Sequence, residues 1–204
     1  SIYSGLPGIP YNVDVDISGT DLTINSTRAV RNNLTITDGS LTLAPATGNF
    51  YIGGNWSRSG ATSAFNDNAN YVEFGGNQDQ TITCSANGNK ETFFGLTINN
   101  TDPTPQVSLI GSTSVEVKEQ LNLISGIVTT GSNEVYVMNN AGTAVTGYQT
   151  DPAAPNLANY LASSYINGNL RREVVAGESY VFPVGTISSY QFDSITLKTF
   201  TVSG

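Results

Sequence analysis

Residues 30–42 read VRNNLTITDGSLT, and residues 117–129 read VKEQLNLISGIVT. Placing Val117 on Val30 aligns three further apolar pairs and a glycine: Leu34 with Leu121, Ile36 with Leu123, Leu41 with Val128, and Gly39 with Gly126. DLTINST at 21–27 likewise recurs as GLTINNT at 95–101. The similarity predicts that a unit of several strands occurs twice, and a recurring unit favours a stacked architecture.

Short alternating segments surround these two stretches, from Tyr11 to Met138. In NVDVDI at 12–17, for example, every second residue is apolar and the residues between are polar. A period of two is that of a β-strand with one dry and one wet face. Eleven of these apolar residues are predicted to share one core: Val13, Val15, Ile17, Leu22, Ile24, Leu34, Ile36, Leu96, Ile98, Leu121 and Leu123.

Very short polar turns, such as those in ITDGSL and LISGIV, join the segments without the Asn-Gly doublets typical of β-hairpins. The sequence therefore predicts an all-β, right-handed parallel β-helix, with a β-sandwich or jelly roll as the alternative. Coils of roughly 20 to 25 residues would give about eight or nine turns and a rod on the order of 40 Å long.

The pattern changes near residue 148. DPAAPN at 151–156 interrupts the strand rhythm, residues 155–163 can form a short helix, and longer strand segments follow. Because a stack of coils ends in an open core, we expect residues 1–147 to form the β-helix repeats and 148–204 to cap the solenoid.

Composition excludes several classes of function. The chain has no histidine, which rules out Ser-His triads and most zinc sites, and its net charge of −8 repels nucleic acid. No run of eighteen apolar residues exists, so direct membrane insertion is not expected. The lone Cys84 alternates with Ile82 like a small core residue, although a reactive or intermolecular thiol is the alternative.

Several phrases, in this order, resemble a group of large secreted surface proteins of Bacteroidota that carry β-helical repeats. They are GGNWSRSG at 53–60, VEFGGNQDQTIT at 72–83, FFGLTINNT at 93–101, VEVKEQLNLISGIVTTGSNEVYV at 115–137, and the closing segment at 165–197. Together they cover most of the chain.

The resemblance implies export through the type IX secretion route, display at the extracellular cell surface, and a non-catalytic role as an adhesin or stalk. The implied partner is a surface glycan or another cell-surface protein, with the secretion machinery recognising regions outside this piece. It implies neither catalytic residues nor cofactors. The alternatives are a glycan-binding module and a polysaccharide-active β-helix enzyme, although the acidic residues are scattered rather than gathered in one groove.

Three kinds of site residue are candidates. Asp14 and Asp16 lie two apart on one strand, a spacing that suits calcium or acid/base hydrolysis, although a wet outer face is the simpler explanation of both. The aromatic rings of Tyr51, Trp56 and Tyr136 can stack on sugars, although core packing is the alternative. Ser194, in Asp-Ser-Ile, resembles a Bacteroidota acceptor site for O-linked glycans.

Overall fold

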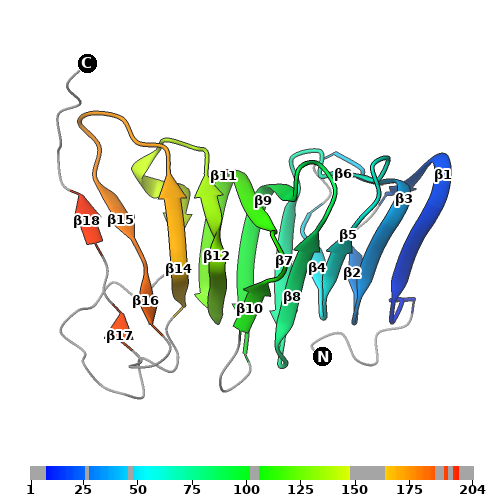
Figure 1. Ribbon diagram of the computed structural model, residues 1–204, viewed down its shortest axis with the longest axis horizontal. Coiled ribbons are helices and arrows are strands. Elements are labelled where there is room, and N and C mark those ends of the chain that lie inside the picture. The colour runs from blue at the N-terminus through cyan, green and yellow to red at the C-terminus, as the bar shows by residue number, and fades with distance from the viewer. Residues whose placement is uncertain are drawn as a thin grey trace.

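The structure is a computed structural model that describes residues 8–25, 28–45, 48–101, 106–147, 164–186, 191–192 and 195–197. Strands far apart in the sequence lie side by side in one 14-stranded sheet that winds along the long axis of the molecule (Figure 1). Neighbouring strands of this sheet are parallel throughout. The predicted parallel β-helix is therefore confirmed, and the sandwich alternative is wrong.

The stack contains these strands: β1 (Val13–Ile24), β2 (Arg28–Val30), β3 (Leu34–Leu43), β4 (Phe50–Ile52), β5 (Trp56–Arg58), β6 (Ala64–Asn66), β7 (Tyr71–Gly76), β8 (Gln80–Cys84), β9 (Lys90–Asn100), β10 (Gln106–Leu109), β11 (Ser114–Ser125), β12 (Ile127–Val137), β13 (Val145–Thr146) and β14 (Tyr165–Arg172). Among the described residues the one helix is η1, a 3-10 turn at Gly142–Ala144, and none is long and apolar enough to cross a membrane.

Strand pairing divides each coil into three faces. Face A contains β5, β8, β10 and the first residues of β1, β3, β12 and β14. Face B contains β6, the later residues of those same four long strands, and the first residues of β9 and β11. Face C contains β2, β4, β7, β13 and the later residues of β9 and β11.

Coil length agrees with the prediction in the first coils but exceeds it later, where Trp56 pairs with Ile82 and Ile82 with Leu109, 26 and 27 residues apart, and the number of coils also differs. On face A, Val13 pairs with Leu34 and Leu34 pairs with Trp56, so consecutive coils are 21 and 22 residues apart. The solenoid has about five turns instead of eight or nine. One reason is that the chain leaves the stack after Arg172 and forms short antiparallel pairs.

The internal similarity that suggested stacking does not mark equivalent places in the solenoid. Leu34 lies on face A beside Val13 and Trp56, whereas Leu121 lies on face C beside Leu96 and Val145. DLTI at 21–24 is on face B and GLTI at 95–98 is on face C. The prediction of a doubled multi-strand unit is wrong, because every strand of every coil obeys the same inward and outward alternation.

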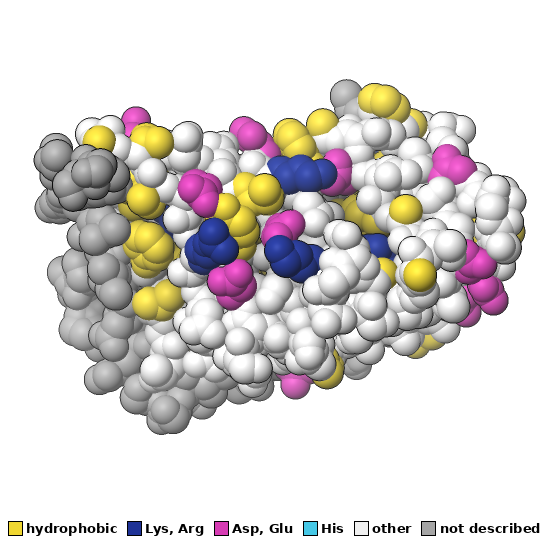
Figure 2. Space-filling model, turned by 45° about the horizontal axis from the view of Figure 1, so that its top comes forward, with side chains coloured by type: hydrophobic (Ala, Val, Ile, Leu, Met, Phe, Trp, Pro, Cys, Tyr) yellow, Lys and Arg dark blue, Asp and Glu magenta, His cyan; other side chains and the backbone are white. Residues whose placement is uncertain are grey.

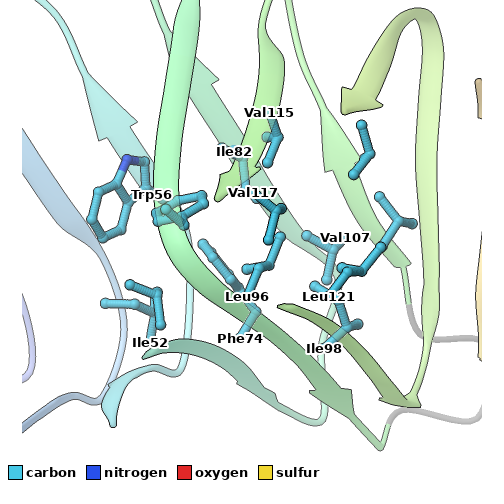
Figure 3. Close-up of a cluster of buried hydrophobic side chains, with 14 of the residues drawn as sticks. Ile52, Trp56, Phe74, Ile82, Leu96, Ile98, Val107, Val115, Val117 and Leu121 are labelled. Atoms are coloured by element: carbon cyan, nitrogen blue, oxygen red, sulfur yellow. The ribbon is translucent and has the colours of Figure 1, made fainter. Parts of the chain in front are cut away.

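The core consists of inward rows that run from coil to coil. One row on face C is formed by five side chains that are each at most 2% exposed: Val30, Ile52, Phe74, Ile98 and Leu123. Figure 3 shows Ile52, Phe74 and Ile98 directed into the same interior as Trp56 and Val117. Each fully buried side chain of this kind contributes roughly 1.5–3 kcal/mol.

Most of the predicted core is confirmed, and two members are wrong. Val15, Leu34, Ile36, Leu96, Ile98, Leu121 and Leu123 are buried, and Val13 and Ile24 pack partly against them. Ile17 and Leu22, however, are each 38% exposed. Both belong to β1, which pairs with β3 alone, so no described coil covers its other side.

Asparagine side chains satisfy backbone groups where face C turns into face A. The amide N–H of Asn33 donates to Asn12 Oδ1 (3.1 Å), that of Asn55 to Asn33 Oδ1 (3.0 Å), and that of Thr81 to Asn55 Oδ1 (2.9 Å). These three bonds form an asparagine ladder that joins four successive coils. Because each bond crosses from one coil to the next, the ladder helps to fix the register of the stack.

The C-terminal region both continues and ends the stack. β14 pairs in parallel with β12, after which β15 (Tyr180–Phe182) pairs antiparallel with β18 (Ile195–Leu197), and β16 (Gly185–Thr186) with β17 (Gln191–Phe192). Arg172 turns inward and donates to the carbonyl oxygens of Val181 and Ala141, 2.8 and 3.0 Å away. The predicted helix at 155–163 lies outside the described residues, and the division at 147/148 stays a prediction.

Candidate functional site

The outward sides of faces A and B differ in chemistry. On face A, hydroxyl residues lie opposite one another: Thr35, Ser57 and Thr83 in one row, and Thr81, Ser108 and Thr129 in another. On face B one outward row reads Thr92, Glu116, Tyr136, Arg171. Figure 2 shows charged side chains of both signs lying among hydrophobic ones across the middle of the molecule. This row of face B therefore carries a carboxylate, a phenol and a guanidinium, where the two rows of face A carry hydroxyls.

Face B also contains a break in the sheet. β6 pairs with β3, and the first residues of β9 pair with β11, but no pairing among the described residues joins β6 to β9. A pocket of about 310 Å³ opens at this break. Six of its lining residues carry polar or aromatic groups: Arg58, Ser63, Phe65, Asn87, Glu91 and Thr92. We call it the β6–β9 pocket.

A buried ion pair forms part of the lining. Arg58 Nε lies 2.9 Å from Glu91 Oε2, and the two residues are 6% and 1% exposed. Both occupy inward positions, since Glu91 pairs with Val115, and Arg58 pairs with Ile36 and Cys84. Charged groups are rarely fully buried unless they are paired, and here the partners come from neighbouring coils.

Glu91 is held by three donors. Besides Arg58 Nε, the indole Nε1 of Trp56 donates to its Oε2 (2.8 Å), and the backbone N–H of Thr92 donates to its Oε1 (3.2 Å). A carboxylate has about four lone-pair sites, so nearly all of its capacity is used within the protein. Glu91 is therefore fixed in place and has little capacity left to act as a general base.

Arg58 spans the break in the sheet. Its Nη1 donates to the carbonyl oxygen of Ser63 (3.0 Å), just before β6, and its Nη2 to that of Lys90 (3.1 Å), where β9 begins. Desolvation opposes the charge, but the hydrogen bonds and negative charge of Glu91 outweigh it and raise the pKa of the guanidinium. Of its five N–H groups, one on each terminal nitrogen has no partner among the described residues.

Cys84 lies beside this pair but is not part of a reactive site. It is 2% exposed, and its thiol donates to the carbonyl oxygens of Ala86 and Lys90, 3.3 and 3.4 Å away. Burial, followed by the charge of Glu91, raises the pKa of the thiol. The predicted core position of Cys84 is confirmed.

The two calcium candidates are exposed on β1. The ladder between β1 and β3 is irregular between Val15 and Asp16, where Asp16 pairs with Asp38. Within the described ranges no three His, Cys, Asp or Glu side chains gather closely enough to hold a metal ion. A calcium site at Asp14 and Asp16 thus stays a prediction that the described geometry does not support.

The aromatic candidates lie in three different environments. Trp56 is fully buried, donates to Glu91 and packs edge-on against Phe65 (4.8 Å between centroids), so it is a core residue and has no ring face for a sugar. Its prediction as a ligand-stacking residue is wrong, because its strand phase points inward. Tyr51 is half-buried and outward on face C, between Ala29 and Glu73.

Tyr136 is half-buried on face B, and its ring is covered by Arg171, whose guanidinium carbon is 4.0 Å from the ring centroid. The phenol donates a short hydrogen bond to Glu173, which raises the pKa of Tyr136. Arg171 lies 3.9 Å from carboxylate oxygens of both Glu134 and Glu173. The side chains of Arg171, Glu134 and Glu173 are exposed, and together with the half-buried ring of Tyr136 they form a platform on face B.

Ser194, the predicted glycosylation site, lies outside the described residues. The sequence analysis missed Arg58 and Glu91, although a signal for both exists. In WSR at 56–58 and ETF at 91–93, the charged residue is two positions from an inward aromatic and so is in the inward phase of its strand. A charge in that phase indicates a buried partner.

Comparison of the chain with protein-family models, with curated proteins and with solved structures found no match. The fold itself defines the class of protein, which is a parallel β-solenoid.

Proposed function

We propose that the chain is a non-catalytic adhesive segment of an exported bacterial surface protein, and that it contacts a surface glycan through face B. The observation that carries the proposal is the difference between the faces. Face A presents rows made mainly of neutral hydroxyls, with Asp14 at the end of one row, whereas face B presents Lys90, Glu116, Tyr136 and Arg171 and contains the β6–β9 pocket.

Support for a spacer role comes from the architecture. A solenoid buries its core between neighbouring coils, so its length and stiffness do not depend on a single globular centre. Such a segment can hold a binding face at a distance from its anchor. Display at the cell surface of Bacteroidota, by the type IX route, is part of the proposal and rests on the sequence resemblance alone.

The experiment is binding of the purified chain to immobilised polysaccharides and to intact cells that display surface glycans. Tyr136→Ala combined with Arg171→Ala removes the exposed platform on face B, and Ser57→Ala combined with Thr83→Ala is the matched pair on face A. We expect binding by the unmodified chain and the face A variant, and weaker binding by the face B variant. Equal loss in both variants, or no binding by any of them, would contradict the proposal.

Catalysis is the competing function, and the same preparations test it. Incubation with pectins, alginate, chitin and host glycans is expected to release neither reducing ends nor unsaturated products. Glu91 is the single carboxylate that lines the β6–β9 pocket, whereas glycosidases use two. Turnover that disappears on substitution of Asp14 or Asp16 would establish an enzyme instead.

A further inference from the structure

We propose that the β6–β9 pocket binds one neutral sugar residue. This inference rests on the proposed glycan contact through face B and names the place and chemistry of that contact. The pocket volume of about 310 Å³ is near the lower end of the range of small-molecule sites, ~300–1,000 Å³. It suits a single ring better than an extended chain.

The two opposite charges in the pocket lining favour a neutral ligand. Arg58 and Glu91 are the two charged residues that line the pocket, and they neutralise each other across 2.9 Å. Because the two charges cancel, the lining offers no net attraction to an anionic or a cationic ligand that would repay the loss of that ligand's hydration. The net charge of −8 of the whole chain further disfavours anionic polysaccharides.

Hydrogen-bonding groups of both kinds remain for a ligand. Arg58 retains one N–H on each terminal nitrogen, and Asn87 makes no side-chain hydrogen bond to a described residue. The hydroxyl of Thr92 donates to Glu116 Oε2 (3.4 Å), so its oxygen is still able to accept. Sugar hydroxyls both donate and accept, and therefore match a lining of this kind.

The remaining wall is apolar. Phe65 is half-buried, and its ring packs against Trp56 and Phe93, with centroids 4.8 and 6.2 Å away. Its position is thus fixed by the core while it also lines the pocket. A rigid aromatic surface beside a few convergent polar groups is typical of sites that bind small amphipathic rings.

The test is titration of the isotope-labelled chain with D-glucose, D-galactose, D-mannose and N-acetyl-D-glucosamine, followed by amide chemical shifts. Glucuronate and glucosamine serve as the anionic and cationic counterparts of glucose. We expect at least one neutral sugar to shift amides of residues 59–66 and 85–93, and the two charged counterparts to bind about tenfold more weakly or not at all.

Matched variants separate binding from folding. Asn87 and Asn89 both have positive φ (49° and 65°), which glycine accepts, but only Asn87 lines the pocket. Asn87→Gly should weaken binding by about three- to tenfold, and Asn89→Gly should leave it unchanged. Phe65→Leu should weaken binding in the same way. Phe94 is a half-buried aromatic residue outside the pocket, and Phe94→Leu should leave binding unchanged.

The outcomes separate this inference from the proposed function. Polysaccharide binding that is lost in the Tyr136 and Arg171 variant but unaffected by Asn87→Gly and Phe65→Leu would overturn the pocket and leave the adhesive role intact. Amide shifts that map elsewhere, or equal binding of glucose, glucuronate and glucosamine, would also overturn the pocket. Binding of neither polysaccharide nor monosaccharide would remove both.

Discussion

Glu91 occupies an inward position at which the next two coils carry Val115 and Val135. Removing one partner of a buried ion pair leaves the other charge without compensation, which costs about 3–5 kcal/mol. We therefore expect Glu91→Val and Arg58→Ile each to lower the free energy of unfolding by that amount, measured by urea denaturation. Glu116→Gln, which breaks the exposed pair with Lys90, should cost less than about 1 kcal/mol.

The double variant Arg58→Ile with Glu91→Val leaves neither charge of this pair buried without its partner, so its loss should be much smaller than the sum of the two single losses. Trp56 Nε1 then lacks its acceptor, which accounts for part of the remaining cost. Strictly additive losses would show that the two charges do not act as a pair.

Asp21 makes the stability of the folded chain depend on pH in the acidic range. Its carboxylate accepts hydrogen bonds from Thr42 (2.6 Å) and Ser40 (2.8 Å) on the next coil, and these lower the pKa of Asp21. Because the pKa of Asp21 is lower in the folded chain than in the unfolded chain, its carboxylate stabilises the fold fully at pH values above the unfolded pKa of about 3.9. This stabilisation is lost as the pH falls through the pKa of the folded chain. We expect the stability difference between the unmodified chain and Asp21→Asn to shrink from about pH 6 to about pH 2.

Thermal unfolding at a series of pH values measures this difference. Asp14→Asn, an exposed aspartate with no side-chain hydrogen bond to a described residue, is the control and should show a smaller change. A difference for Asp21→Asn that stays constant with pH would contradict the role assigned to its hydrogen bonds.

Cys84 should be chemically inert in the folded chain. Its burial and raised pKa keep the thiol protonated and inaccessible at neutral pH. We expect a colorimetric disulfide reagent to react with Cys84 only after denaturation, at a rate limited by unfolding. Rapid reaction of the native protein would show that the core opens locally around β8.

The contribution of the asparagine ladder to stability can be tested at a single coil corner. Asn33→Ala removes the acceptor of the Asn55 N–H and one link between two coils. The expected loss is about 1 kcal/mol, measured by urea denaturation. Asn25 is an exposed asparagine outside the ladder, and Asn25→Ala should change stability by less than about 0.5 kcal/mol. Equal effects would mean that solvent replaces the ladder bond.

Alternation was enough to predict the individual strands, and short turns were enough to predict stacking. Alternation did not assign the strands to faces, because an inward Leu gives the same sequence pattern on face A, in β3, as on face C, in β11. The β6–β9 pocket was beyond prediction for a related reason. Arg58 and Glu91 are 33 residues apart in sequence and meet only because adjacent coils bring β5 and β9 together.

Across the whole molecule, stability should fall toward the first coil. Central strands other than β6 have a paired neighbour on each side, whereas the terminal strand β1 pairs with β3 alone and leaves Ile17 and Leu22 exposed. In a solenoid each coil depends on its neighbours, so the end opens at lower free energy. Hydrogen exchange should be faster in β1 than in β8, and uniform protection would indicate that the coils unfold together.

The corners of the coils differ in length: the single residue Gly126 separates β11 from β12, whereas residues 59–63 separate β5 from β6. The β6–β9 pocket is built largely from two such corners, 59–63 and 85–89, and the strands that follow them. Rows of core side chains, together with the asparagine ladder at one corner, keep the strands aligned when the other corners vary. Insertions and exchanges at corners can therefore accumulate without refolding the rod. We expect related proteins with this scaffold to bind different ligands because the sequences of their corners differ, while the strands and their core rows stay the same.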